Sequence, residues 1–260
     1  MRRPTARRLA SLTAFLALVL AACQGEAVAL LDDPNDILAA AATSTAAATS
    51  VRAELAVAGI ITADAFGGGG VPAVDLRDTS LIADLDLRTS HGRFAFSAPG
   101  LMGINGEVIT TAEGSYFKTS MTGTKYQFTP NDAMVPAPEN PLKGLVDLIA
   151  RRDLDPVKGA DVPCAGGTCY TLTVQLTAEE LAAIGGGVAP GDLVGLPVPE
   201  VAGASMDLII HVEQTTGRLS DINAKAALGD LGELTVTATF THWNEDFQIR
   251  VPPPELVERF

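Results

Sequence analysis

Strict alternation of apolar and polar residues is the feature that most constrains how this chain can fold. In the segment 81–88, Leu81, Ala83, Leu85 and Leu87 share a face opposite Asp84, Asp86 and Arg88, and in 234–241 apolar residues alternate with four threonines. Such alternation is typical of a β-strand with one apolar and one wet face. About ten such segments follow one another and are separated by turn residues. They are Val51–Ile60, Leu81–Leu87, Arg93–Ser97, Val108–Thr111, Tyr116–Ser120, Cys169–Leu176, Met206–Val212, Leu219–Leu228, Leu234–Thr241 and Phe247–Val251. One-sided strands indicate a broad antiparallel sheet that packs on something with one face.

Helical patterns are few, and they are expected to cover the apolar side of this sheet. Asn35–Thr49 is rich in alanine, and Leu142–Arg152 places apolar residues at helical spacing. A third helix is expected over Thr177–Ile184, where Thr177 and Glu180 form a capping box. The chain therefore predicts an α+β fold.

The first 22 residues have the features of an export signal. Four arginines precede an apolar run, Leu9–Leu20, that is too short to cross a bilayer as a permanent helix. The residues Leu20-Ala21-Ala22-Cys23 that follow resemble the lipobox of bacterial lipoproteins, in which the cysteine is acylated, for instance with palmitate, and becomes the first mature residue. We therefore predict a signal peptide over 1–22, a lipidated Cys23 and an extracytoplasmic protein anchored to the membrane of the cell envelope.

The charge of the mature chain excludes some partners. The signal holds four of the 18 basic residues, which leaves 14 basic against 31 acidic side chains. A surface this acidic repels phosphate backbones and anionic headgroups, so no nucleic acid partner is expected and membrane attachment is assigned to the acyl anchor.

Cys164 and Cys169 stand five residues apart in the mature chain. In an oxidising compartment they are expected to close a small disulfide loop, worth about 2 kcal/mol from loop entropy. A metal site would need further ligands nearby, and none is expected. A redox-active pair is an open alternative, although C-x4-C is not the thioredoxin spacing.

Catalytic motifs find little support in the sequence. His91, His211 and His242 are scattered, and none lies in a recognisable nucleophile or metal motif. The carboxylate pairs, Glu179-Glu180 and Asp153/Asp155, are of a kind that arises by chance in an acidic protein. We therefore expect no enzyme activity, no cofactor and no metal.

Several segments, in order, resemble the LppX/LprA/LprF/LprG family of actinobacterial lipoproteins. The carriers of the resemblance are the lipobox, an alanine-rich first helix, the Gly114–Phe117 segment, the run Met206–Leu219 with its Thr-Gly-x-Leu ending, and Leu234–Pro254, which is similar to the family's closing hairpin. They cover nearly all of the mature chain. The glycine run 67–70, the Cys164/Cys169 pair and the acidity depart from the family pattern.

The resemblance implies a fold similar to the LolA/LolB lipoprotein carriers. In it, a strongly curved antiparallel sheet, or half-barrel, wraps a few helices and leaves an apolar cavity between them. The expected organisation is a signal peptide over 1–22, a tether over 23–34 and a single lipid-binding domain over 35–260.

The function implied is binding and transfer of an acylated lipid or glycolipid, with a membrane transporter as an expected further partner. Two alternatives stay open: a sensor or interaction module that binds a regulatory protein, and, as a weaker third reading, a hydrolase. The apolar residues expected to line the cavity come from the sheet and from the central helix. They are Leu85, Leu87, Phe94, Phe96, Leu208, Ile210, Leu234, Val236 and Phe240 from the sheet, with Leu145, Leu148 and Ile149 from the helix.

Overall fold

A computed structural model describes residues 30–62, 73–131, 142–180 and 204–259. The chain separates into two units, Met1–Leu30 and Leu31–Phe260. The second unit contains the elements discussed below. The predicted signal peptide and Cys23 lie outside the described residues.

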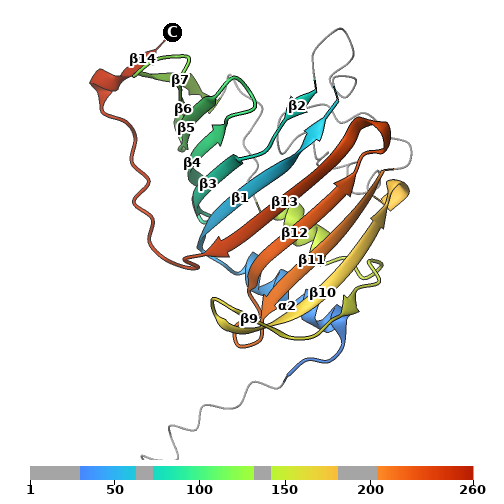
Figure 1. Cartoon of the computed structure of the whole chain (residues 1–260). Helices are drawn as coiled ribbons and strands as arrows, with labels where there is room; N and C mark the ends of the chain where they lie inside the picture. The colour runs from blue at the N-terminus through green and yellow to red at the C-terminus, as the bar shows by residue number, and fades with distance from the viewer. Residues whose placement is uncertain (1–29, 63–72, 132–141, 181–203, 260) are drawn as a thin grey trace, which may run out of the picture. The chain divides into compact units, whose positions relative to one another are not determined.

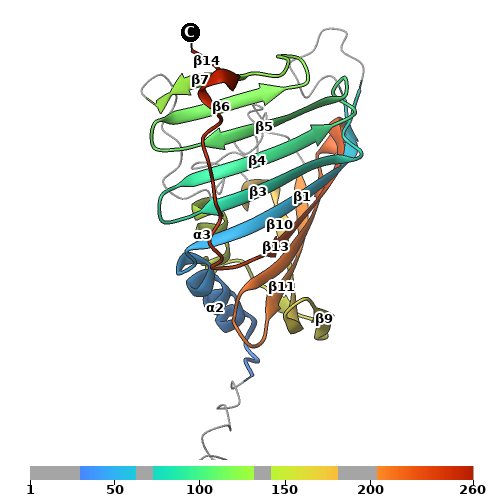
Figure 2. The same ribbon diagram turned by 90° about the vertical axis from the view of Figure 1, so that its left-hand side faces the viewer.

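A single open sheet of 14 strands dominates the described part of the second unit, in the order β14-β7-β6-β5-β4-β3-β1-β13-β12-β11-β10-β8, with β2 on β1 and β9 on β10. The sheet curls strongly without closing (Figures 1 and 2). All strand pairs are antiparallel except β14 with β7. Its strands are β1 Ser50–Ile61, β2 Val74–Asp75, β3 Thr79–Asp86, β4 His91–Ala98, β5 Ile104–Thr110, β6 Gly114–Thr119, β7 Tyr126–Pro130, β8 Val157–Lys158, β9 Val162–Cys164, β10 Gly167–Thr177, β11 Ser205–Glu213, β12 Leu219–Ala227, β13 Gly232–Thr241 and β14 Val257–Arg259. The half-barrel predicted from the resemblance is confirmed.

The first helix, α2 (Pro34–Ala46), begins one residue before the predicted Asn35 and ends three residues before the predicted Thr49. The Asp33 carboxylate caps it by accepting a hydrogen bond from the Asn35 N–H at 2.8 Å, and Pro34 occupies the first turn, where a missing N–H costs nothing. The predicted helix extended to Thr49. Instead, the Thr49 N–H donates to the Asn244 side chain at 2.8 Å, and β1 begins at the next residue.

The second helix, α3 (Lys143–Ile149), is shorter than the predicted Leu142–Arg152. At its C-terminal side, the Arg151 guanidinium pairs with the Asp153 carboxylate at 2.7 Å. Residues 178–180 are also helical, and the capping box is confirmed: Thr177 N–H and Oγ1 both donate to the Glu180 carboxylate, at 2.7 and 2.8 Å. The rest of that predicted helix lies outside the described residues. Two 3-10 turns, Gly229–Leu231 and Pro254–Leu256, complete the helical elements described.

Both α-helices lie against the inner face of β10–β12 (Figure 1), and we call this assembly the base. Its core joins Ile37 and Leu38 of α2 and Ile149 of α3 to Leu172 and Ile210 of the sheet, all of them fully or nearly fully buried. The strands β3–β7 form the arm, and β1 and β13 lie between arm and base.

The end of the chain corrects one prediction. Phe247–Val251 is not a strand, and Leu234–Pro254 is not a closing hairpin. After β13 the chain turns at Asn244, whose backbone has a φ of 61° and whose N–H donates to the Ser50 carbonyl at 2.9 Å. Residues 242–256, which we call the strap, then cross the arm (Figure 2) and lead to β14, which pairs in parallel with β7.

The strap covers the outer face of the arm. There, Ile109, Tyr116 and Tyr126 form a second apolar cluster, against which Ile249 and Val257 pack. The strap's alternation of Phe247, Ile249 and Val251 looks like that of a strand, but Ile249 packs on the outer cluster and Phe247 lies under Arg52, and neither extends a ladder. This packing is why the pattern misled the prediction.

Candidate functional site: the apolar inner face

Strand register places the apolar side chains of neighbouring strands on the same inner face. Leu55 pairs with Leu81 on one side and with Ala238 on the other, and Phe94 pairs with Val108. Residues directly opposite each other in an antiparallel pair point to the same side of the sheet. The predicted one-sided character of these strands is therefore confirmed.

Burial divides this inner face into two parts. In the base, most of it is buried under the helices: Leu172 and Val174 are 0% exposed, although Met206, Ile222 and Ala224 are only partly buried. Towards the arm, apolar residues continue in the same register but are only half-buried. We call this second set the apolar panel; it comprises Leu55, Val57, Leu81, Phe94, Phe96, Val108, Leu234 and Val236.

The twelve predicted lining residues fall into both parts. Five are buried in the base core or at its margin: Leu85, Ile149, Leu208, Ile210 and Phe240. Four are half-buried and pack against that core: Leu87, Phe94, Leu145 and Leu148, of which Phe94 also belongs to the panel. The remaining three, Phe96, Leu234 and Val236, are half-buried and belong to the panel.

Sequence reasoning missed several inner-face residues. Leu55, Val57, Leu81 and Val108 of the panel were not selected, although the register places them beside residues that were. Leu172 and Val174, the most buried side chains of β10, were also missed. Their signal was present, because apolar residues alternate with threonine and glutamine along 170–176.

A closed cavity between helices and sheet stays a prediction. Two shallow hollows lined by described residues have volumes of about 350 and 380 Å³. They lie around Ala58, Asp78 and Thr235, largely on the outer side of the sheet, and contain none of the twelve predicted residues.

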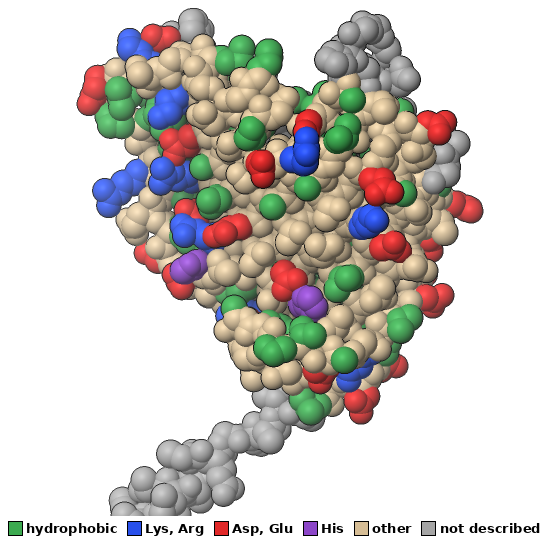
Figure 3. Space-filling model, in the orientation of Figure 1, with side chains coloured by type: hydrophobic (Ala, Val, Ile, Leu, Met, Phe, Trp, Pro, Cys, Tyr) green, Lys and Arg blue, Asp and Glu red, His purple; other side chains and the backbone are tan. Residues whose placement is uncertain are grey.

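Outside the arm, the outer face of the sheet is mostly polar. Figure 3 shows isolated acidic, basic and apolar side chains separated by other groups on this side. His211 Nδ1 lies 2.6 Å from the Asp221 carboxylate across β11 and β12, and the Asn223 side chain donates to Thr237 Oγ1 at 3.0 Å. Each of these pairs joins neighbouring strands, which gives them a structural role in the sheet.

The other two predicted histidines also have local partners. His91 Nε2 accepts a hydrogen bond from the Ala112 N–H at 3.0 Å, and His242 Nδ1 lies 3.0 Å from the Glu245 carboxylate. The three histidines thus occupy three separate places. Among the described residues, no three His, Cys, Asp or Glu side chains gather as a metal site would require.

The Glu107 carboxylate, in the arm, is mostly buried and is held by a network of polar side chains. Glu107 accepts hydrogen bonds from Tyr126 and Arg93, and Lys118 Nζ lies 4.4 Å from the centre of the Tyr126 ring. Burial raises the pKa of Glu107, but the hydrogen bonds from Tyr126 and Arg93 outweigh it and hold the pKa below its ordinary value of 4.5. Burial, with the bond to Glu107, raises the pKa of Tyr126. This network ties β4, β5, β6 and β7 together.

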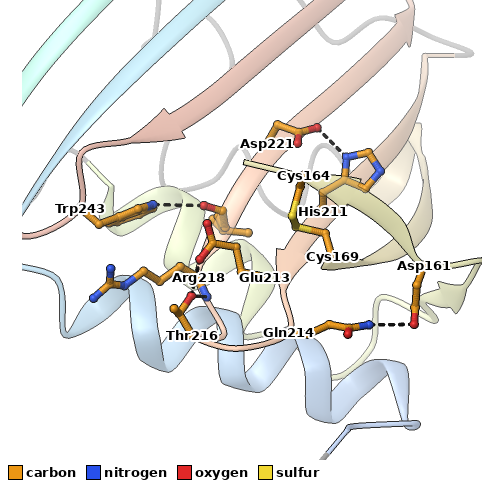
Figure 4. The surroundings of a disulfide bond; sticks show 11 residues. Asp161, Cys164, Cys169, His211, Glu213, Gln214, Thr216, Arg218, Asp221 and Trp243 are labelled. Atoms are coloured by element: carbon orange, nitrogen blue, oxygen red, sulfur yellow. Dashed lines mark hydrogen bonds and ion pairs between the residues drawn. A yellow bond between two sulfur atoms is a disulfide. The ribbon is translucent and has the colours of Figure 1, made fainter. Parts of the chain in front are cut away.

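The predicted disulfide is confirmed. Cys164 of β9 and Cys169 of β10 are bonded, with their Cα atoms 5.8 Å apart (Figure 4). Beside the disulfide, the Glu213 side chain packs so closely on Gly166 that any larger residue at position 166 would collide with it. The Gln214 side chain donates to the Asp161 carboxylate at 2.7 Å. The bond therefore staples a tight hairpin at the edge of the base.

The start of the second unit is fixed to the base. The Leu31 N–H donates to the Tyr170 hydroxyl at 2.7 Å, and Lys158 Nζ donates to the Leu31 carbonyl at 2.9 Å. In the described part of the chain, no helix is both long and apolar enough to span a bilayer.

Comparison with solved structures gives the class of fold. LprF from Mycobacterium bovis matches with a TM-score of 0.54 and 14% identity, over 84% of this chain and 96% of LprF. The lipoprotein LppX from Mycobacterium tuberculosis matches with a TM-score of 0.47 and 13% identity, over 84% of this chain and all of LppX. A LolA superfamily protein from Nitrosomonas europaea matches at a TM-score of only 0.26 and 8% identity, over 86% of this chain and 97% of that one. No protein-family model and no curated protein matches the sequence.

The likeness to LprF defines the fold as the LprF fold: an unclosed, curled antiparallel sheet with helices on its inner side. The particular resemblance predicted from the sequence, to the LppX/LprF group of lipoproteins, agrees with the solved structures found. At sequence identities of 13–14%, the likeness shows a shared fold alone.

Proposed function

We propose that this protein is an extracytoplasmic lipoprotein that binds the acyl chains of a lipid or glycolipid on the apolar panel and carries that lipid between membranes. The observation that supports the proposal most is the continuation of the inner apolar face beyond the helices that bury it in the base. A sheet that only needed a core could change to polar residues at the point where the helices end.

The energetics of lipid transfer explain why such a surface is useful. At roughly 0.8 kcal/mol per methylene, a sixteen-carbon chain loses on the order of 13 kcal/mol of free energy on entering water. A lipid with one or two such chains stays in its membrane unless an apolar surface receives it. Carriage therefore needs no reaction; it needs an apolar site and proximity to the donor and acceptor membranes.

Proximity is the role proposed for Cys23. An acylated cysteine at the start of the mature chain holds the domain at the membrane, and a membrane transporter is the proposed source or recipient of the lipid. The segment 23–30 precedes the fixed Leu31 junction and can span at most about 28 Å. A Cys23→Ser variant is expected to fold and take up lipid normally but to deliver it poorly, measured as transfer between two vesicle populations.

The direct test of binding is organic extraction of the purified protein followed by mass spectrometry. We expect an acylated lipid at about one equivalent, together with uptake of a fluorescent fatty acid. A protein that carries no lipid and takes up no probe would refute the proposed function.

A pair of variants on one strand separates site from fold. Val236 points to the inner face of β13, and Thr235 beside it points to the outer face. Val236→Arg places a charge among the panel residues and is expected to abolish uptake of the probe, whereas Thr235→Arg is expected to leave it unchanged. Equal uptake by both variants, with unfolding transitions like that of the parent protein, would show that the lipid binds elsewhere.

A further inference from the structure

Two turns of the arm lie side by side at one end of the sheet. Residues 99–103 join β4 to β5, and residues 120–125 join β6 to β7. The Ser120 N–H donates to the Asn105 carbonyl at 2.8 Å, and the Asn105 N–H lies 3.3 Å from Ser120 Oγ. The hydrogen bonds between β5 and β6 therefore continue as far as both turns, so the two turns are held next to each other.

These two turns carry the most exposed large apolar side chains among the described residues. Met102 is 85% exposed and Met121 is 70% exposed, with Leu101 at 39% beside them. A single exposed apolar residue is ordinary on a protein surface, but a cluster on adjacent turns marks an interaction site. We call Leu101, Met102 and Met121 the apolar tip.

The backbone at Met102 is left-handed, although the residue is neither glycine nor asparagine. Its φ is 58°, a left-handed conformation that non-glycine residues adopt at a cost, and Gly103 follows with a φ of 68°. Glycine would relieve the strain at position 102, and a polar side chain would relieve the exposure. A methionine there presents an apolar group to the surroundings at the expense of both.

The sequences of the two turns are unusual in charge for this protein, although Asp75, Arg77 and Asp78 line a hollow with Pro99 and Gly100 at the start of the first turn. The segments 98–106 and 119–126 contain no acidic residue, although the chain has 31 acidic against 18 basic residues. The charged residue that they do contain is Lys125, whose Nζ lies 3.2 Å from the Glu258 carboxylate. The turns therefore offer apolar side chains, hydroxyls and one amine, a combination that suits the headgroup region of a bilayer.

From these observations we propose that the apolar tip inserts into the surface of a lipid bilayer and docks the arm there. The proposal rests on the proposed function, since it takes the membrane from which lipid is collected as the occupant. A protein partner fits less well: a stable protein interface buries about 1,200–2,000 Å² and is enriched in aromatic and arginine residues. The tip is three side chains on two turns and has neither.

Weak insertion is sufficient because the domain is tethered. A chain of eight residues from Cys23 to Leu30 keeps Leu31, in the base, within about 28 Å of the anchor, so the domain stays at the bilayer and raises the local concentration of the tip there. Docking then brings the arm, and with it the panel, to the membrane surface.

The test uses the lipidated protein reconstituted in vesicles of phosphatidylcholine, with and without phosphatidylglycerol. Cys164 and Cys169 are bonded to each other and Cys23 is acylated in the proposal, so Met102→Cys introduces a single free thiol for a polarity-sensitive dye. Val157→Cys is the matched control, because Val157 is 66% exposed on the edge strand β8 of the base.

We expect the dye at position 102 to be quenched by nitroxides carried on the lipid chains and the dye at position 157 to stay in water. In a Cys23→Ser form without the anchor, replacing Leu101, Met102 and Met121 by serine is expected to lower vesicle partitioning at least about tenfold. A water-exposed dye at position 102 would overturn the inference, as would shielding that appears only as protein density on the vesicle rises, which would indicate a second copy.

Cargo is measured separately by extraction and mass spectrometry. Lipid cargo without quenching at position 102 would overturn the docking inference and leave the proposed function standing. Quenching at position 102 without any lipid cargo would overturn the proposed function and leave the docking inference standing.

Discussion

The base and the arm use the same sheet in opposite ways. In the base, the inner face is sealed by α2 and α3, and Leu172 and Ile210 are almost completely buried. In the arm, a second buried cluster lies on the outer face under the strap, around Ile109 and Tyr116. On the inner face, Ala83 and Leu85 of β3 join the core of the base, while the half-buried apolar panel extends over β1, β13 and β3–β5.

This difference indicates a division of labour. The base is stabilised by the packing of its inner face, and the apolar side chains buried there are not accessible to a ligand. The arm is also held from outside by the strap and by the Glu107 network, so its inner apolar side chains beyond Ala83 and Leu85, which belong to the core, are not all needed to close it. A surface that does not carry the fold is free to bind a ligand.

The largest predicted effect compares one leucine from each region. Leu172→Ala in the base is expected to lower the free energy of unfolding by about 3 kcal/mol, because it leaves a cavity in a closed core. Leu81→Ala on the panel is expected to cost about 1 kcal/mol or less, because a half-buried side chain loses less contact. Urea denaturation followed by circular dichroism measures both, and equal losses would show that the panel is an ordinary part of the core.

The next effect concerns the strap. Ile249→Ser removes a side chain that packs on the outer cluster and is expected to cost about 1–2 kcal/mol, expressed locally as faster amide exchange in β5–β7. Exchange in α2 and β10 is expected to stay as it is in the parent protein. Val251→Ser is the matched control, since Val251 is 50% exposed, and it is expected to change neither region.

The smallest effect depends on pH. Because the pKa of Glu107 is lower in the folded protein than its ordinary value of 4.5, the unfolded chain takes up the proton first on acidification. The stability from this carboxylate is therefore complete above about pH 4.5 and is lost as the pH falls through the folded pKa. Glu107→Gln is expected to flatten this part of the stability profile, and Glu113→Gln, at an exposed position, is expected to leave it unchanged. A profile that Glu107→Gln does not alter would contradict the role assigned to the network.

Much of the sheet was predictable because its pattern is local. Alternation along 81–87 and 234–241 tells which side chains share a face whatever the neighbouring strands are, and both predictions are confirmed. The start of α2 was predictable for the same reason, since Asp33 and Pro34 act within one turn.

What depends on distant partners was not predictable. Nothing near Phe247 or Ile249 tells that their partners are the outer face of the sheet, where Arg52 lies over the Phe247 ring at 5.9 Å, instead of a neighbouring strand. Likewise, Leu208 and Val236 have the same chemistry in sequence, but helices cover only the first. The choice between core and panel is made by tertiary packing, which alternation cannot report.

The most direct test of this account is photolabelling with a fatty acid that carries a diazirine on its chain. We predict that mass spectrometry will find the label on panel peptides, around Phe94, Phe96 and Val236, and that excess unlabelled fatty acid will displace it. Label confined to the base helices or to the outer face, or spread evenly over the protein, would contradict the claim that the panel is the lipid site.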